Sequence, residues 1–215
     1  MKNVKPKAVP ADPNVRLSSH LKSKSEGETI EHYREPVGAL LYLALQTRPN
    51  LAYAVGQVAR YGQNPKAEHW QAVVNIAGYL KGTKDYGIWV GGDRIGLVGY
   101  SDADFAVDIN DRKSTSGSIF FFHGKPVAWE SKKQPCTALW TTEAEYTSTC
   151  EAAITAVWLS YLLQDLTGEE QKKVPLYYEN QAAVRLVYNA EFNQRTKHIQ
   201  LRWHWIKEQA ANNII

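Results

Sequence analysis

Three carboxylates in the second half of the chain lie where the sequence predicts junctions between strands and helices. Asp102 follows the apolar run IGLVGY, Glu145 lies in the first turn of a long helical pattern, and Glu179 ends the β-prone run VPLYY. Ligand sites of α/β proteins form outside the carboxyl ends of strands, and hard divalent cations prefer carboxylate oxygens. The three acids therefore predict a Mg²⁺ site if the fold brings them together.

Each of these acids also has an ordinary structural interpretation. The spacing Thr142-x-x-Glu145 matches a capping box, and a negative charge at a helix start suits the helix dipole. Asp102 and Asp104, which share a face if the strand continues, could belong to a turn. Glu179 could stand at an N-cap, although Glu is a poor residue for that position. Spacing alone leaves the metal site and these local roles open, and Glu145 could serve both.

The composition is that of a folded protein with a proper core. The chain has 215 residues, of which 44% are hydrophobic and 22% charged. The longest apolar block, VGALLYLAL, is too short to span a bilayer, and the N-terminal MKNVKPKAVPADPN lacks the apolar region of a secretory signal. Cys136 and Cys150 have neither metal-ligand spacing nor the density of a disulfide scaffold. We expect an intracellular protein, cytoplasmic or nuclear, with ordinary thiols and no membrane partner.

The first part of the chain predicts a small helical unit after an irregular lead-in. Residues 1–28 are rich in Lys, Pro and Ser and lack periodicity, so we expect a flexible or extended segment. Three helical patterns over 29–83 follow: HYREPVGALLYLALQT, NLAYAVGQVARYG and AEHWQAVVNIAGYLKG. Their predicted apolar stripes are Val37, Leu40, Leu41, Leu45; Leu51, Val55, Val58, Tyr61; and Trp70, Val73, Val74, Ala77, Leu80.

After Gly82 the hydrophobic period changes to that of strands. YGIWVGG, IGLVGYSDA, GSIFFFHG and KPVAWES are predicted strands, and the last two form a hairpin around His123-Gly124. A helix over TTEAEYTSTCEAAITAVWLSYLLQDLTG follows, then the strand VPLYYE, a short helix NQAAVRLVYN and a last helix IQLRWHWIKEQAANN. The predicted apolar face of the long helix is Tyr146, Cys150, Ile154, Val157, Tyr161 and Leu162. This order predicts an α/β layer fold over 84–215.

Several motifs in one order resemble a known family. YSDADFAVDINDRKSTSG, SKKQP, TTEAEY, ENQAA and RTKHIQLRWHWIKE resemble the ribonuclease H domain of copia-type retrotransposon polyproteins. The upstream REPVGALLYLALQTRPNLAYAVGQVARY and HWQAVVNIAGYLKGTKDYG resemble the preceding thumb or connection end of reverse transcriptase. The resemblance implies a ribonuclease H-like mixed sheet flanked by helices. No Tyr-x-Asp-Asp pair precedes the helical unit, so DNA synthesis by this chain alone is not expected.

The resemblance also implies a reaction and its residues. The ancestral activity is Mg²⁺- or Mn²⁺-dependent endonucleolytic cleavage of RNA in RNA–DNA hybrids, which uses two ions. Asp102 and Glu145 match the first two family acids. The third is an aspartate where this chain has Glu179, whose extra methylene shifts the carboxylate by about 1 Å, beyond the roughly 0.5 Å tolerance of a catalytic group. The family reads His-Ile-Asp where this chain reads His198-Ile199-Gln200. We therefore expect a degenerate active site with impaired cleavage and incomplete metal occupancy.

Basic residues in the loops predict contacts to nucleic acid. The candidates are Arg112, Lys113, Lys132, Lys133, Arg195, Lys197 and His198. Such contacts would give salt-sensitive, sequence-independent binding. The alternative is a solvated surface, because 25 basic residues face 22 acidic ones, and His198 could instead be a helix-start residue. Trp140, Trp203, Trp205 and Tyr178 could stack on bases or pack in the core.

A second function of a different class follows from the family fold. In that fold a fifth strand, which lies beyond this sequence, pairs with the strand that ends at Glu179. Without it the strand presents an open edge, and open edges pair with other chains. The alternative function is thus a non-catalytic, domesticated interaction or nucleic-acid-binding module, as a homodimer or docked on a partner protein.

Overall fold

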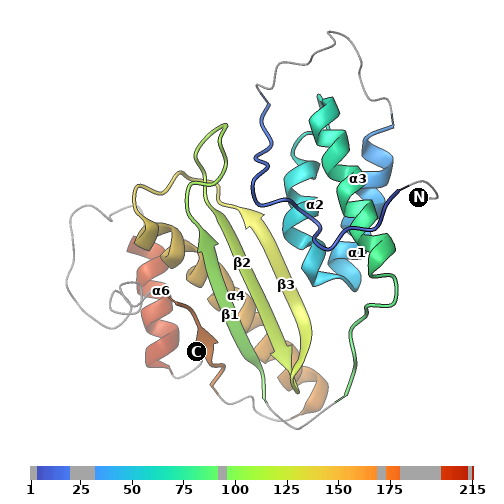
Figure 1. Ribbon diagram of the computed structural model, residues 1–215. Coiled ribbons are helices and arrows are strands. Elements are labelled where there is room, and N and C mark those ends of the chain that lie inside the picture. Colours follow the sequence, from blue (N-terminus) through green and yellow to red (C-terminus); the bar gives the residue numbers. More distant parts are fainter. Residues whose placement is uncertain (1–3, 20–31, 92–95, 169–172, 180–199, 213–214) are drawn as a thin grey trace. The chain divides into compact units, whose positions relative to one another are not determined.

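The protein forms two compact units in the computed structural model (Figure 1). The structure describes residues 4–19, 32–91, 96–168, 173–179, 200–212 and 215. The first unit comprises Met1–Trp89 together with Asp108–Arg112, and the second comprises Val90–Val107 and Lys113–Ile215. Within the described ranges, none of the helices has the length and apolar character needed to span a bilayer. The division of the chain between residues 83 and 84 stays a prediction.

The three helices predicted for the first unit are confirmed. They are α1 (Arg34–Gln46), α2 (Ala52–Ala59) and α3 (Ala67–Gly82), with the 3₁₀ turn η1 (Pro49–Leu51) before α2. Pro49 suits the first position of this turn because the backbone N–H there has no partner inside the helix. These helices enclose a core that contains Tyr33, Leu51, Val55 and Ile76, each at most 1% exposed.

The predicted apolar stripes of this unit are correct in part. Leu51, Val55, Val58 and Tyr61 are all buried. Leu45, however, is 64% exposed, and Ala44 is buried in its place. The buried stripe of α1 runs through Val37, Leu40 and Ala44, which is another apolar face with helical spacing. Trp70 is 37% exposed, with its ring 6.4 Å from that of Tyr33 at the rim of the core.

The described part of the N-terminal lead-in is extended and lies along α3. The backbone N–H of Lys7 donates to the Gly78 carbonyl at 3.2 Å, and Lys81 Nζ donates to the Val4 carbonyl at 2.9 Å. A Cβ atom at position 78 would stand 2.6 Å from the Lys5 carbonyl oxygen. A glycine at position 78 therefore lets the lead-in approach the helix closely.

Residues 108–112 complete the first unit. The Asp108 carboxylate is 7% exposed and accepts a hydrogen bond from Arg60 at 3.1 Å. Asn110 donates its backbone N–H to the same carboxylate at 2.9 Å. The Asn110 side-chain oxygen in turn accepts bonds from the Ser19 backbone N–H at 2.8 Å and the Ser18 hydroxyl at 3.2 Å. A buried charge is tolerated here because it is both paired and hydrogen-bonded.

The second unit is a mixed four-stranded sheet covered by a long helix. Its elements are β1 (Val98–Asp104), β2 (Thr115–Phe122), β3 (Lys125–Lys133), α4 (Thr141–Thr167), β4 (Leu176–Tyr177) and α6 (Gln200–Ala211). The strand order is β3-β2-β1-β4, with β4 parallel to β1 and the other pairs antiparallel. The hairpin turn has positive φ at His123 (52°) and Gly124 (72°), as tight hairpin turns require. The predicted α/β class with a mixed sheet is confirmed.

One predicted strand is wrong. YGIWVGG forms no strand within the described residues 86–91, where Trp89 is 83% and Val90 92% exposed. Strand propensity is realised only where side chains pack against neighbours, and these side chains lack such contacts. The predicted short helix NQAAVRLVYN lies outside the described residues, whereas the last helix is confirmed as α6.

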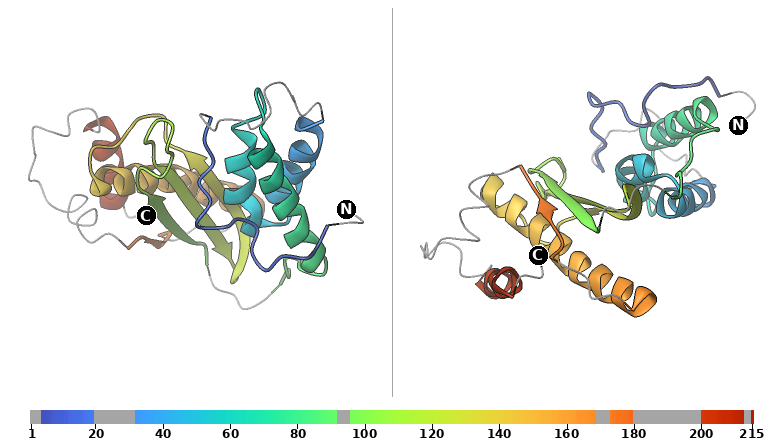
Figure 2. Two further views of the ribbon diagram at one scale, coloured as in Figure 1. Left: turned by 45° about the horizontal axis from the view of Figure 1, so that its top comes forward. Right: turned by 90° about the horizontal axis from the view of Figure 1, so that it is seen from below.

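The long helix α4 crosses one face of the sheet, and Figure 2 shows this arrangement with the strands seen from two further sides. Its predicted apolar face is wrong in part. Tyr146 and Cys150 are buried, but Ile154 and Tyr161 are 56% and 57% exposed. The buried stripe consists largely of small residues, with alanines at positions 144, 152, 153 and 156. Small residues let a helix approach closely, so hydrophobic side chains alone do not identify the packed face of α4.

Candidate functional site

Asp102 lies on the face of β1 that points away from α4. Along this strand Ser101 and Ala103 are buried, whereas Tyr100, Asp102 and Asp104 are exposed. The predicted common face of the two aspartates is therefore confirmed. Asp102 Oδ1 accepts the backbone N–H of Ala103 at 2.8 Å.

Glu145 is a buried acid on α4. It is 8% exposed, and its Oε2 atom is buried without a hydrogen-bond partner. Burial raises the pKa of Glu145 to about 7, with further contributions from the charges of Asp102 and Glu179. A hydrogen bond from the Ala103 backbone N–H acts in the opposite direction on this pKa. Asp102 and Glu179 thus lie close enough to Glu145 to influence its pKa.

The capping-box interpretation of Glu145 is wrong. Helix α4 has Trp140 at its N-cap with no side-chain cap hydrogen bond. Glu143, not Glu145, reaches back over the helix start, and its Oε2 accepts the Leu139 backbone N–H at 2.8 Å. Because the two acids differ by two helix positions, only one of them can point toward the helix start while the other points inward. Glu145 is the inward one.

Glu179 stands two residues beyond β4. This strand pairs in parallel with β1, through Gly99 with Leu176 and Tyr100 with Tyr177. Asp102 and Glu179 therefore belong to the carboxyl-end side of two adjacent parallel strands, where α/β proteins place their ligands. Glu179 is exposed, so the site is open to solvent on this side.

The donor chemistry of this site suits Mg²⁺, while the ligand set is incomplete. Glu145 Oε2 is a buried carboxylate oxygen without a partner, and a cation is one way to satisfy such an atom. Carboxylate oxygens are also what Mg²⁺ prefers. Yet in the part of the chain that the structure describes, no three His, Cys, Asp or Glu side chains lie close enough to hold one ion. The carboxylates are thus the kind of ligand that Mg²⁺ prefers, but the described side chains do not form a complete ligand set.

Only some of the predicted nucleic-acid-binding residues are described. Lys132 is exposed and forms a 3.8 Å pair with Glu130 that is open to solvent, which contributes little stability. Arg112 adopts a positive φ of 58° in the segment that belongs to the first unit. Arg195, Lys197 and His198 lie outside the described residues. Nucleic-acid binding by Arg112, Lys113, Lys132, Lys133, Arg195, Lys197 and His198 stays a prediction.

The aromatic candidates divide between core and surface. Trp205 packs against the cluster of Tyr146, Cys150 and Ile206, so it belongs to the core. Trp140 is 60% exposed beside the start of α4. The Trp203 side chain lies outside the described part of α6.

The sequence analysis did not predict the buried polar residues that lie beside the acids. Ser148 Oγ donates to the Asp102 carbonyl at 2.6 Å, and Gln134 Nε2 donates to the Ala144 carbonyl at 2.8 Å. Thr149 Oγ1 donates to the Glu145 carbonyl at 2.9 Å. In sequence these residues resemble ordinary surface positions, and no local signal shows that they are buried.

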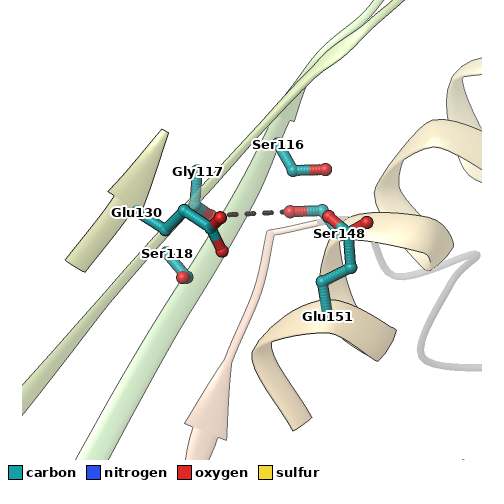
Figure 3. Close-up of a pocket in the computed structure, with 6 residues that line it drawn as sticks. All are labelled: Ser116, Gly117, Ser118, Glu130, Ser148 and Glu151. Atoms are coloured by element: carbon teal, nitrogen blue, oxygen red, sulfur yellow. Dashed lines mark hydrogen bonds between the residues drawn. The ribbon is translucent and has the colours of Figure 1, made fainter. Parts of the chain in front are cut away.

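A small pocket lies next to these bonds, between α4 and the sheet (Figure 3). It is lined by Ser116, Gly117, Ser118, Glu130, Ser148 and Glu151. Its size of about 10 Å³ is enough for roughly one water molecule. The pocket is thus too small for a substrate.

The chain is an α/β protein with a mixed sheet. Its candidate metal site consists of three acids near the carboxyl ends of the parallel strands β1 and β4. No protein-family model matches the chain. The Pol polyprotein from transposon TNT 1-94 of Nicotiana tabacum is 43% identical over 97% of this chain, which covers 16% of the polyprotein. The corresponding protein from transposon RE2 of Arabidopsis thaliana is 37% identical over 100% of this chain and 15% of its own length. The chain is therefore homologous to a segment of the retrovirus-related Pol polyproteins of copia-type transposons.

The chain is also similar to a secreted effector protein in sequence and to a solved ribonuclease structure in fold. Secreted RxLR effector protein 161 of Plasmopara viticola is 46% identical over 129 residues, which are 60% of this chain and 91% of the effector. Among solved structures, LC11-RNase H1 is 16% identical with a TM-score of 0.39, and it covers 55% of this chain and 79% of its own. The same enzyme has been solved in complex with an RNA/DNA hybrid. The chain spans only about a sixth of the transposon polyproteins, in line with the 16% and 15% covered.

Proposed function

We propose that this chain carries the ribonuclease H module of a retrotransposon polyprotein. Its ancestral reaction is the Mg²⁺- or Mn²⁺-dependent cleavage of the RNA strand in RNA–DNA hybrids, inside the cell, and its present cleavage is weak. The observation that carries this proposal is the Glu145 carboxylate, which is buried, has an oxygen without a partner, and responds to the charges of Asp102 and Glu179. Burial and like charge around one acid are typical of a functional site.

Asp102, Glu145 and Glu179 are the residues that would hold the metal. When bound, two divalent cations supply an activated water and stabilise the leaving oxygen. Asp102 and Glu179 are exposed and can meet a substrate directly, whereas Glu145 supports the site from α4. The Ala103 backbone N–H donates to Asp102 and interacts with Glu145, and so helps to orient both carboxylates. Phosphates of the hybrid would contact Lys132, Lys133 and the other predicted basic residues.

Two substitutions relative to the family support weak cleavage. Glu179 carries one methylene more than the family aspartate, and it is exposed, so few contacts restrain its carboxylate. Gln200, the first residue of α6, stands where the family has an aspartate. A neutral amide does not balance cationic charge as a carboxylate does. Catalytic groups that are displaced by about 1 Å can lose on the order of 100-fold in rate.

A labelled RNA–DNA hybrid with Mg²⁺ or Mn²⁺ tests this proposal. We expect slow cleavage by the unaltered chain and none by Asp102→Asn. The double variant Glu179→Asp/Gln200→Asp should cleave about 10-fold faster or more, because it restores both family carboxylates. Glu143→Gln is the matched control, since it removes from the same helix turn a carboxylate whose Oε2 atom accepts the Leu139 backbone N–H at the helix start.

Two outcomes contradict the proposal in different ways. Fast cleavage by the unaltered chain that Asp102→Asn abolishes would disprove the impairment. No cleavage by any variant, the double variant included, would reject the activity and favour the non-catalytic binding or interaction module. That alternative has an observation of its own, because the Plasmopara viticola effector consists almost entirely of the segment shared with this chain. Salt-dependent hybrid binding would then separate a nucleic-acid-binding module from a protein-interaction module.

A further inference from the structure

A serine hydroxyl joins α4 to β1 at the residue that carries the first acid. Ser148 lies three residues after Glu145, on the buried side of α4, and is 1% exposed. Its Oγ donates to the Asp102 carbonyl at 2.6 Å and lies 3.5 Å from the Gly117 carbonyl, the longer contact being drawn in Figure 3. One side chain of α4 therefore touches β1 and β2 together.

A glutamine makes a second connection between α4 and the sheet, at the residue that precedes Glu145 in the sequence. Gln134 is 3% exposed and lies between β3 and α4. Its Nε2 donates to the Ala144 carbonyl at 2.8 Å and to Ser116 Oγ at 3.0 Å. Its backbone N–H donates to the Ser114 carbonyl at 2.9 Å. The residue directly before Glu145 is thereby tied to β2.

Packing alone does not explain these two side chains. The buried stripe of α4 includes four alanines, and alanine at position 148 would fill nearly the same space without burying a hydroxyl. Serine and threonine inside helices often bond back to the carbonyl four residues earlier. Thr149 and Thr155 do so, with Glu145 and Glu151 as acceptors. Ser148 instead bonds across to the sheet.

We propose that Ser148 and Gln134 are positioning residues that fix the spacing between the backbones of Asp102 and Glu145. This inference rests on the proposed function of the two acids. The bonds are accepted by backbone carbonyls, of Asp102 itself and of Ala144 next to Glu145. They therefore position the backbone that carries each carboxylate, and the carboxylate oxygens can still bind a metal. Without them α4 can shift along the sheet, and metal-binding carboxylates tolerate displacements of only about 0.5 Å.

The test is Ser148→Ala in the full chain, with Ser160→Ala as the matched control. Ser160 is on the same helix and also buried, at 7% exposure, about three turns further along. For Ser148→Ala we expect Mn²⁺ affinity, measured by calorimetry, to fall about 10-fold, as for residues that support metal ligands. With the hybrid, kcat should fall while KM stays unchanged. The melting temperature should fall no further than in Ser160→Ala.

Two other variants keep the test decisive if Ser148→Ala folds poorly. Ser148→Thr restores the hydroxyl, and its added methyl can enter the small pocket that Ser148 lines, so Mn²⁺ affinity should recover. Gln134→Met keeps the volume and removes the amide donors, so it should reproduce the loss of Mn²⁺ affinity. Unchanged Mn²⁺ affinity in Ser148→Ala and Gln134→Met would overturn the inference, as would a loss matched by Ser160→Ala.

Failure of the proposed function gives a different result. If the unaltered chain neither binds Mn²⁺ nor cleaves the hybrid, that function is rejected. Amide hydrogen exchange of residues 144–149 then decides on the positioning role. Faster exchange in Ser148→Ala than in Ser160→Ala supports it, and equal exchange in both overturns it.

Discussion

The buried Glu145 carboxylate predicts a stability that depends on pH. Its pKa is raised to about 7, first by burial and then by Asp102 and Glu179. An acid whose pKa is higher in the folded state than in the unfolded state favours folding only while it is protonated. Its destabilising effect is therefore absent below the unfolded pKa, grows as the pH rises from about 4.3 toward 7, and is complete above 7. Glu145→Gln should be more stable than the unaltered chain at pH 8, by on the order of 2 kcal/mol.

Urea unfolding at pH 4, 6 and 8 measures this effect. The gain in Glu145→Gln should shrink toward zero at pH 4. Glu143→Gln should show no such gain, because it weakens a hydrogen bond that the Glu143 carboxylate accepts from the Leu139 backbone N–H. A difference that is the same at all three pH values would show that Glu145 acts through packing alone.

For individual residues, the sequence selected three acids whose role as metal ligands stays a prediction, and it did not indicate the buried polar residues beside them. Motif and strand position were enough to select Asp102, Glu145 and Glu179. Spacing could not decide between capping and an inward role for Glu145, since Glu143 and Glu145 both lie in the first helical turns. Ser148 and Gln134 could not be found, because burial of a polar side chain depends on distant strands.

Among the elements, the pairing of β1 with its two neighbours depends on a glycine. A Cβ atom at Gly99 would lie 2.5 Å from the Phe120 ring and 2.9 Å from Leu176 Cδ1. Phe120 is fully buried and cannot move away easily. Gly99→Ala should therefore destabilise the chain by about 1–3 kcal/mol, as overpacking does.

Chemical denaturation of Gly99→Ala beside Gly96→Ala tests this expectation. Gly96 has no atom within 4 Å of an added Cβ, so alanine there should change the unfolding free energy little. Equal unfolding free energies for the two variants would show that the side chains of Phe120 in β2 and Leu176 in β4 can move away from position 99 without cost. It would also weaken the link between β4 and the position of Glu179.

The hydrophobic periodicity of the sequence predicted the positions of most helices and strands. It predicted less well which face of each helix is packed. Helix α3 begins and ends where the pattern AEHWQAVVNIAGYLKG does, and Gly168 ends α4 with a φ of 70°. The apolar residues of YGIWVGG suggested a strand, but residues 86–91 have no partner strand in the described structure. On α4 several large hydrophobic side chains, among them Ile154 and Tyr161, lie outside the packed stripe, where small residues allow close approach to the sheet.

On the scale of the whole molecule, a buried histidine predicts acid sensitivity of the first unit. His69 is fully buried and stacks on Tyr61 at 3.8 Å. Its Nδ1 accepts the Lys66 backbone N–H at 3.0 Å, so Nε2 carries the proton toward the Ser18 carbonyl at 3.1 Å. Burial lowers the pKa of His69, against opposing effects of the Ser18 carbonyl and Glu68.

A base whose pKa is lower in the folded state gives stability that is present above its unfolded pKa, about 6.5, and is lost as the pH falls below it. The first unit should thus become less stable between about pH 7 and 5. Thermal unfolding at several pH values, with His69→Gln for comparison, measures this change. Glutamine does not titrate in this range, so the variant should lose the part of the pH dependence that His69 causes. The same dependence in both proteins would assign it to other groups.

The division into units was only partly visible in the sequence. The change from helical to strand periodicity near Gly82 marks the end of α3. That residues 108–112 belong to the first unit could not be predicted, because Asp108 and Arg60 are distant in sequence and neither lies in a recognisable pair motif.

This interrupted layout has an evolutionary consequence. The first unit is assembled from two stretches of the gene, and the Arg60–Asp108 ion pair joins one stretch to the other. Recombination between related transposons at any point from codon 90 to codon 107 would combine a guanidinium from one parent with a carboxylate from the other. Loss of either charge breaks this buried ion pair, so the two positions should change together as these lineages diverge.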